Sequence, residues 1–309
     1  MAPGLWNPAV RVCEAAAGTL VTWFELTAPD TIRLRAMRRG PDGAAIDAAP
    51  LPIATSVAPG ATVGVNSVDV APSPLGWTLV YRFDWANGGN PVEICVVDVP
   101  ASGSPSQRGC IQGGFRPSIS AVDGGHLVAW WAGGEVPAFF TGLRLGPGEA
   151  PTWQTSGAGG ATSGLPVLET SSEGQTISAV VSDGSRALAP SRYLSGRPGA
   201  TLFDVSTAKV LRPRFPLADE TAVDGPVAAF VGEHYWVAWR GKPPAGALRV
   251  VRVDRDGQPV GQVATVAEVG RAWPGLSLAP APGGALLVAT PLDQQLGSAR
   301  VKLLPLLAP

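Results

Sequence analysis

Residues 232–263 read GEHYWVAWRGKPPAGALRVVRVDRDGQPVGQV, and this stretch decides the fold. It contains an apolar run at 235–239, a Gly/Pro loop, an alternating run at 248–253, a turn at 254–257 and a second alternating run from Gln258. Short runs of β-branched and aromatic residues bounded by Gly, Pro and Asp are typical of strands. A glycine at the end of the turn tolerates the positive φ of a hairpin corner. The stretch therefore predicts an antiparallel meander.

The outline of this meander recurs along the chain. The six central runs are TLVTW, WTLVY, HLVAW, QTISA, HYWVAW and ALLVA. A glycine precedes each run, at intervals of 58, 49, 49, 58 and 52 residues: Gly18, Gly76, Gly125, Gly174, Gly232 and Gly284. A further apolar segment, most often with proline near its start, lies before each glycine, and more strand-like runs follow each central run. A repeat of this length predicts a four-stranded unit.

This pattern resembles the β-propeller superfamily over nearly the whole chain. The resemblance implies an all-β fold of six four-stranded antiparallel blades around a central channel, in which each blade buries its faces against its neighbours. We expect one domain spanning 1–309, and a last blade that either has three strands or is completed by a short N-terminal piece. The alternatives are a right-handed β-helix, which needs a shorter repeat, and a pair of β-sandwiches. The expected blades are approximately 6–58, 65–113, 114–160, 164–212, 222–268 and 271–309.

Composition supports short strands and narrows the range of partners. The 309 residues include 39 glycines and 31 prolines, which disfavour helices, while 45% hydrophobic residues are too many for a disordered chain. Basic and acidic residues nearly cancel, at 23 and 24, so no nucleic-acid partner is predicted. The uncharged stretches 48–68 and 273–292 are interrupted by proline and glycine, so we expect no membrane span.

Cysteine placement bears on the cellular compartment. Cys95 and Cys110 lie in the runs VEICVVDV and RGCIQ, and a hairpin would bring their thiols within bridging distance. The alternative is two unlinked cysteines. Cys13 is expected to be a small buried residue. A bonded pair favours an extracellular or periplasmic location with the leader absent from the start MAPGLWNPAV, and a cytoplasmic location is the alternative.

Polar and aromatic residues gather where the first strand of each predicted blade begins, at one mouth of the channel. Amides, carboxylates, a guanidinium and indoles suit a small polar ligand such as a sugar. Structural roles are the alternative: an asparagine can cap a strand start, and Arg116 can pair with a carboxylate inside the channel. The recurring Trp23, Trp130 and Trp239 are expected to pack between blades. The predicted ligand-binding residues are Trp6, Asn7, Asn66, Arg116, Asp224 and Trp273.

Whether the protein is an enzyme is left open, because no catalytic set is assembled in the sequence. Two histidines without ligand spacing, three cysteines without a Cys-x-x-Cys pair and the lack of a nucleotide-binding loop predict no metal and no cofactor. Glycoside cleavage needs only two carboxylates across a pocket. The candidates are Glu25, Asp84, Asp183, Asp224 and Asp293.

Residues 115–131, FRPSISAVDGGHLVAWW, are similar to the Arg-X-Pro segment that opens the six-bladed sialidases. This resemblance implies that Arg116 holds a substrate carboxylate. The repeated Ser-X-Asp-X-Gly-X-X-Trp turn of that family is absent, and DRDGQPV at 254–260 echoes it distantly. The sequence thus predicts a secreted or periplasmic binding propeller with carbohydrate as the expected ligand. A sialidase-like glycoside hydrolase and a protein-docking scaffold are the alternatives.

Overall fold

In the computed structural model the chain forms two compact units. The first comprises Met1–Gly133 with Thr141–Leu165, and the second Gly134–Phe140 with Pro166–Pro309. None of the described residues forms a helix that could cross a lipid bilayer. The structure describes residues 10–28, 30–59, 66–85, 93–112, 115–132, 139–151, 176–177, 180–193, 195–207, 209–223, 225–242, 247–267, 275–281, 284–290, 292–293, 298–299 and 302–307.

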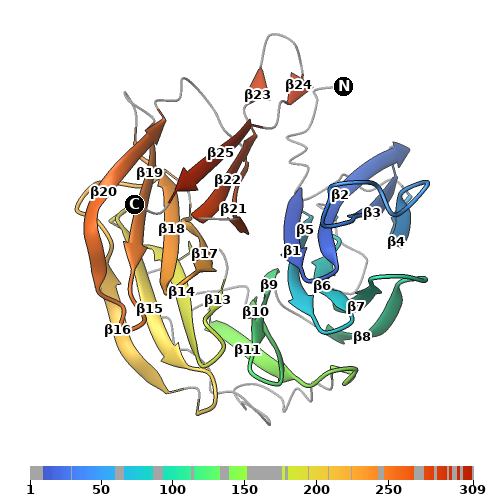
Figure 1. Cartoon of the computed structure of the whole chain (residues 1–309), viewed down its shortest axis with the longest axis horizontal. Helices are drawn as coiled ribbons and strands as arrows, with labels where there is room; N and C mark the ends of the chain where they lie inside the picture. The colour runs from blue at the N-terminus through green and yellow to red at the C-terminus, as the bar shows by residue number, and fades with distance from the viewer. Residues whose placement is uncertain are drawn as a thin grey trace. The chain divides into compact units, whose positions relative to one another are not determined.

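Three antiparallel sheets, each joined strand to strand in chain order, form the first unit (Figure 1). The first strands of the three sheets, β1, β5 and β9, contact one another in sequence. The first sheet holds β1 (Arg11–Ala15), β2 (Gly18–Ala28), β3 (Thr31–Arg39) and β4 (Leu51–Val57); the second holds β5 (Ser67–Ser73), β6 (Gly76–Arg82), β7 (Glu93–Pro100) and β8 (Ser106–Gln112); the third holds β9 (Phe115–Val122), β10 (Gly125–Ala132) and β11 (Phe139–Leu145).

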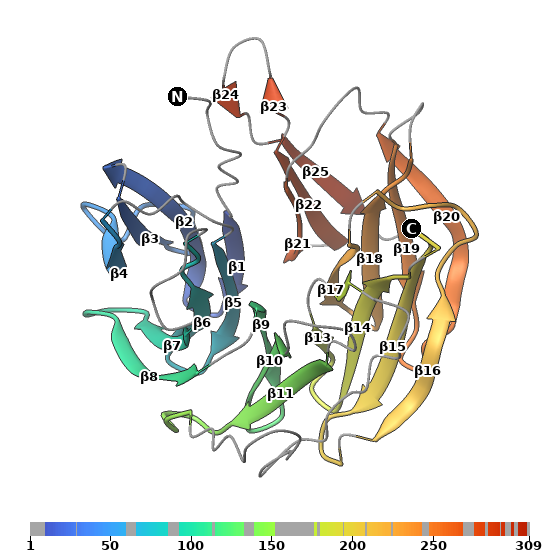
Figure 2. The same cartoon turned by 180° about the vertical axis from the view of Figure 1, so that it is seen from behind.

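The second unit also carries three antiparallel sheets, and a short separate hairpin, seen from behind in Figure 2. The fourth sheet of the chain holds β12 (Thr176–Ile177), β13 (Val181–Ser182), β14 (Arg186–Arg192), β15 (Pro198–Asp204) and β16 (Val210–Pro216), and the fifth holds β17 (Val227–Val231), β18 (His234–Arg240), β19 (Leu248–Val253) and β20 (Pro259–Ala267). The sixth sheet holds β21 (Gly275–Ala281), β22 (Gly284–Thr290) and β25 (Lys302–Leu307). The hairpin consists of β23 (Leu292–Asp293) and β24 (Ser298–Ala299).

The prediction of an all-β chain with six blade-like sheets is confirmed, and the last sheet has three strands among the described residues. The stretch at 232–263 forms β18, β19 and the start of β20, and Gly257 takes a φ of 81° in the turn between the last two. The fourth strand expected for the third blade falls largely on residues that the structure does not describe. The division into one domain with the predicted blade limits stays a prediction.

Close approach of two strands explains why a glycine opens the second strand of the first three sheets. Gly18, Gly76 and Gly125 take φ values of 120°, 146° and 157°. A Cβ atom on these glycines would lie 2.0, 2.5 and 2.0 Å from a main-chain oxygen at the end of the third strand of the same sheet. No side chain fits there, so the repeat signal has a steric cause.

The fourth sheet corrects the prediction that QTISA forms a central strand. Residues of this run lie in β12, which pairs with β14 together with β13 at one edge of the sheet, and β14 is the second strand. The turn of this hairpin contains Gly184, with a φ of 105°, so this glycine replaces Gly174 in the predicted series. The segments predicted as the third and fourth strands, which begin at Ser191 and Ala200, therefore lie one place earlier in the sheet, in β14 and β15.

Apolar side chains fill the space between consecutive sheets within each unit. Trp130 packs with residues of the second and third sheets, and Trp239 with residues of the fourth and fifth. Both are almost fully buried, which confirms that they pack between blades. Trp23 is half-buried and belongs to none of the described core clusters.

Arginines link consecutive sheets by donating to main-chain carbonyls near the end of the third strand of the next sheet. Arg38 donates to the oxygens of Pro100 and Gly103, at 2.7 and 3.0 Å. Arg108 donates to Gly146 at 3.2 Å, and in the second unit Arg186 donates to Arg255 at 2.7 Å. Charged donors make strong hydrogen bonds to such carbonyls. We call these contacts arginine clasps.

Candidate functional site

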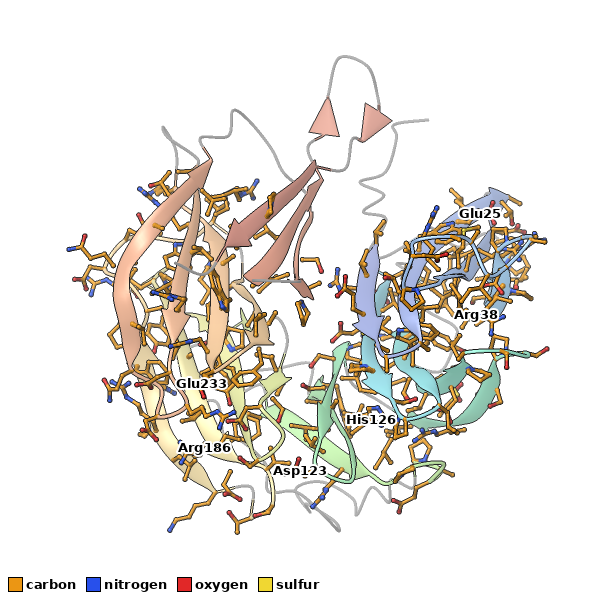
Figure 3. The ribbon with its side chains drawn as sticks, viewed as in Figure 1. Glu25, Arg38, Asp123, His126, Arg186 and Glu233 are labelled. Carbon is orange, nitrogen blue, oxygen red and sulfur yellow. A yellow bond between two sulfur atoms is a disulfide. The ribbon has the colours of Figure 1, made fainter. Side chains whose placement is uncertain are left out.

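The predicted site falls at one end of each sheet. In an antiparallel blade the first strand begins where the second strand ends, and we call this the loop end. The opposite end, where the first strand turns into the second, is the hairpin end. Figure 3 labels Asp123, Arg186 and Glu233 at hairpin ends and His126 within β10. A ligand contacting the predicted residues would meet the loop ends.

At the loop end of the second sheet, a side-chain amide joins the two chain segments. Asn66 precedes β5, is buried, and its Oδ1 accepts a hydrogen bond from the main-chain nitrogen of Asp84 at 2.9 Å. The capping contact considered for Asn66 is therefore present, because the amide substitutes for a main-chain partner. Ligand binding by Asn66 stays a prediction.

A guanidinium, a carboxylate and an indole surround this cap. Arg82 Nη2 lies 3.3 Å from Asp84 Oδ1, and Trp85 Nε1 donates to Ser56 Oγ at 2.9 Å in the first sheet. Burial lowers the pKa of Arg82, and the Asp84 charge opposes that effect. The Arg82 side chain is 3% exposed and that of Asp84 is 31% exposed, so the carboxylate is the group of this pair that a ligand can reach.

Asp69, which sequence reasoning missed, ties together the first strands of three sheets. Its Oδ2 accepts from the main-chain nitrogen of Ile119 in β9 at 3.0 Å, and its Oδ1 lies 3.7 Å from Arg11 Nε in β1. Burial raises the pKa of the Asp69 carboxyl, with the Arg11 charge acting against it. The sequence did hold a sign of this role, because an acidic residue lies inside the strand-like run NSVDVA. A carboxylate that is buried in a strand needs a hydrogen-bonding or charged partner.

The loop end of the fifth sheet is held by main-chain pairing and by one acid. Val223 donates to the Arg240 carbonyl at 2.8 Å, and Arg192 donates to the Val223 carbonyl. Glu220 accepts from Trp239 Nε1 at 3.0 Å and lies 3.2 Å from Arg249 Nε. No motif in the sequence marked Arg192, Glu220 and Arg249, because they come from three separate segments.

Two of the candidate carboxylates lie outside the loops that follow the second strands. Glu25 lies within β2 rather than in the following loop, where its Oε2 is 3.2 Å from Arg35 Nε (Figure 3). Asp183 lies at the hairpin end of the fourth sheet, since the strand shift moves its segment to the turn before β14. Its Oδ1 accepts from the main-chain nitrogen of Arg186 at 2.6 Å, and Oδ2 is 3.5 Å from Arg255 Nε. Turn geometry and an ion pair thus account for Asp183.

The remaining predicted residues cannot be placed as side chains. Arg116 belongs to β9 and Asp293 to β23, but the structure describes only their backbone. Trp6, Asn7, Asp224 and Trp273 lie outside the described residues.

His126 has a structural environment between two sheets. It is buried, and its Nε2 lies 3.0 Å from the carbonyl of Pro72 in the neighbouring sheet. Burial lowers the pKa of the ring, which favours the neutral imidazole.

The chain matches no protein-family model and no curated protein sequence. Solved structures are similar. A subtype N11 neuraminidase-like protein of influenza A from a flat-faced bat has 11% identity and a TM-score of 0.55, over 96% of this chain and 86% of that one. A six-bladed lectin from Aleuria aurantia with fucose recognition has 11% identity and a TM-score of 0.50, over 86% and 80%. The WD40 domain of Toxoplasma gondii coronin has 11% identity and a TM-score of 0.50, over 96% and 70%.

The chain has the fold of a six-bladed β-propeller. At 11% sequence identity these similarities indicate the fold alone, so any binding or catalytic role must be argued from the chain's own residues.

Proposed function

We propose that this propeller is a binding module that holds a glycan at the loop ends of its blades. One observation carries the proposal: every candidate catalytic carboxylate with a described side chain faces an arginine, as Glu25, Asp84 and Asp183 do. In each of these pairs the carboxylate meets a guanidinium rather than a second carboxylate, whereas glycoside cleavage needs two carboxyl groups across one pocket. Hydrogen bonding to hydroxyl groups has no such requirement.

The loop end of the second sheet supplies the chemistry for this binding. Asp84 offers a partly exposed acceptor whose position is fixed by the Asn66 cap and by Arg82. Carboxylates held in this manner accept well from sugar hydroxyls, and a fixed side chain loses little entropy on binding. The fucose recognition of the Aleuria aurantia lectin, on a similar fold, is compatible with this proposal.

An extracellular or periplasmic location fits the same proposal. Cys95 and Cys110 are joined by a disulfide, as one of the two sequence interpretations expected. Disulfides persist in oxidising compartments and are rare in the cytosol.

The glycoside hydrolase alternative keeps one supporting observation, the raised pKa of Asp69. A carboxyl that holds its proton to higher pH is what a general acid needs. Its Oδ2 already accepts from Ile119 and its Oδ1 faces Arg11, which leaves it poorly placed to protonate a leaving group.

A glycan array with the full chain, followed by calorimetric titration of each bound glycan, tests the proposal. We expect binding that Asp84→Asn weakens about tenfold, the loss of one charge-assisted hydrogen bond. Asp256→Asn is the matched control, because it neutralises a carboxylate paired with Arg186 in the turn between β19 and β20, away from the loop end, and it should bind as the parent does. Silence across the array with turnover of chromogenic glycosides would favour the hydrolase, and that turnover should then be lost in Asp69→Asn. Silence in both assays would leave protein docking.

A further inference from the structure

Three side chains with metal-binding atoms lie together on one face of the second sheet. Cys95 in β7 is directly opposite Cys110 in β8, and Glu93 precedes Cys95 by two residues in the same strand. Residues two apart in a strand point to the same face. The sulfur atoms and a Glu93 carboxylate oxygen all lie within 4.8 Å of one another. Backbone pairing therefore holds the three groups in place.

We propose that reduction of the Cys95–Cys110 disulfide creates a site for one thiophilic divalent cation of the zinc class, bound by both thiolates and by Glu93. Two sulfurs and a carboxylate oxygen suit zinc, which takes four ligands, so a water molecule would complete the set. This site is separate from the loop ends and does not depend on glycan binding. The sequence did not reveal it, because cysteines 15 residues apart form no metal-binding motif.

The surroundings allow both reduction and binding at this place. Cys110 is half-buried on β8, the last strand of its sheet, and Gln107 Nε2 lies 3.2 Å from its sulfur, so polar groups reach this side. Cys95 is buried and packs in the apolar cluster between the first two sheets. Cys110 is thus the less buried cysteine of the two and the one that a reductant reaches first, while Cys95 is held by packing. A metal bound here would replace the lost covalent link between β7 and β8.

The electron and proton balance requires a dithiol reductant. That reductant gives two electrons and two protons to the disulfide, which opens into the Cys95 and Cys110 thiols, and it becomes a disulfide itself. Binding of the divalent cation then releases both thiol protons to solvent, because the thiolate is the ligand. The complex of two thiolates, one carboxylate and a divalent cation carries a net charge of −1. A disulfide oxidant that takes two electrons from the thiolates and two protons from solvent becomes a dithiol, restores the Cys95–Cys110 bond and releases the metal.

Cobalt(II) provides the test, since its thiolate complexes absorb in the near ultraviolet. The full chain is reduced with a dithiol, the reductant is removed without oxygen, and cobalt is titrated. We expect about one cobalt per reduced chain, none in the oxidised chain, and release of cobalt by added zinc. Glu93→Gln should weaken cobalt binding about tenfold or more, since even ligand-supporting residues are worth that much.

Two variants act as matched controls. Cys13→Ala removes a thiol outside the site, and Glu25→Gln a carboxylate outside it; both should bind cobalt as the parent does. Equal binding by the oxidised and reduced chains would overturn the proposal, as would unchanged binding in Glu93→Gln. Circular dichroism must show that the reduced chain keeps its sheets. Loss of that signal would also overturn the proposal, because the three ligands meet only in the paired β7–β8 register.

Discussion

Arg38 and Asp47 form a two-oxygen ion pair that is shielded from solvent, with 2.5 Å between Nη2 and Oδ1 and both side chains 6% exposed. The same guanidinium donates to the carbonyls of Pro100 and Gly103 in the second sheet. Asp47 therefore supports a contact between blades through the arginine that it holds.

Removing the Asp47 charge should destabilise the fold strongly. Asp47→Asn leaves the Arg38 guanidinium without its counter-charge, and we expect the free energy of unfolding to fall by about 3–5 kcal/mol. Urea unfolding followed by circular dichroism measures the loss. The control is Glu25→Gln, which breaks the more exposed pair with Arg35 and should change the free energy by less than about 1 kcal/mol. Equal effects of the two variants would contradict the role of the clasp.

Two aspartates should give opposite dependences on pH. Hydrogen bonding from Arg38 lowers the pKa of Asp47, so its stabilisation is complete above pH about 4 and is lost as the pH falls through the folded-state pKa. Burial raises the pKa of Asp69, so its ionisation disfavours the folded state as the pH rises above about 4. The deficit of Asp47→Asn should therefore shrink in acid.

Asp69→Asn should gain in relative stability from acid to neutral pH, because the amide removes the ionisation while an amide oxygen can still accept from Ile119. Thermal melts of both variants and the parent between pH 3 and pH 7 provide the comparison. Shifts of the same sign in the two variants would refute the assigned pKa directions.

A thiol count on denatured, unreduced protein should find one free group. The disulfide uses Cys95 and Cys110, and Cys13 is the free cysteine. Burial raises the pKa of the Cys13 thiol, so the folded chain should react with a thiol reagent far more slowly than the denatured one. Three free groups after denaturation would show that the disulfide does not form, and would remove its support for an oxidising compartment.

Substitution of the glycine that opens a second strand should be far more costly than substitution of a turn glycine. In Gly125→Ala the new Cβ would lie 2.0 Å from the Leu145 oxygen. Gly148→Ala is the control: it has a φ of 70° but nothing within 4 Å of the Cβ. We expect about 1–2 kcal/mol for the control, from backbone strain alone, and a larger loss for Gly125→Ala. Urea midpoints that fall equally would exclude the steric explanation.

Arg116→Ala tests the predicted channel residue. If Arg116 contacts the ligand, the variant should bind more weakly, by about tenfold or more for a lost charged hydrogen bond, with little change in melting temperature. Calorimetry and thermal melting of the same preparation measure the two effects. A large drop in melting temperature would assign the guanidinium to the structure instead.

The sequence was informative where strands alternate and turns are short. The runs around His234 and Arg249 predicted β18 and β19, because hydrophobic alternation and turn glycines act locally. The fourth sheet was misassigned since Pro190 lies in its second strand, where a proline is unexpected. The neighbouring edge of the sheet is split into two short strands: β12 pairs with β14 after Pro190, and β13 pairs with β14 before it. Pro190 has no N–H to donate to the ladder at the break.

The candidate site was harder to predict because it depends on contacts between segments far apart in the chain. The Asn66 cap could be anticipated from a polar residue at a strand start. The link from Asp69 to Arg11 and Ile119 requires three strands to meet, and no local pattern reports that register. Residues that meet only in the folded chain, as these three do, therefore form no motif in the sequence.

The arginine clasps divide the constraints on the chain into two kinds. Their acceptors are peptide oxygens, so residues such as Pro100 or Arg255 can change identity while the oxygen stays available. A single inserted residue in the same turns would withdraw that oxygen from reach. The side chains at these acceptor positions can therefore vary while the length of the turn cannot. Chains with little sequence in common can in this way keep the same contact between blades.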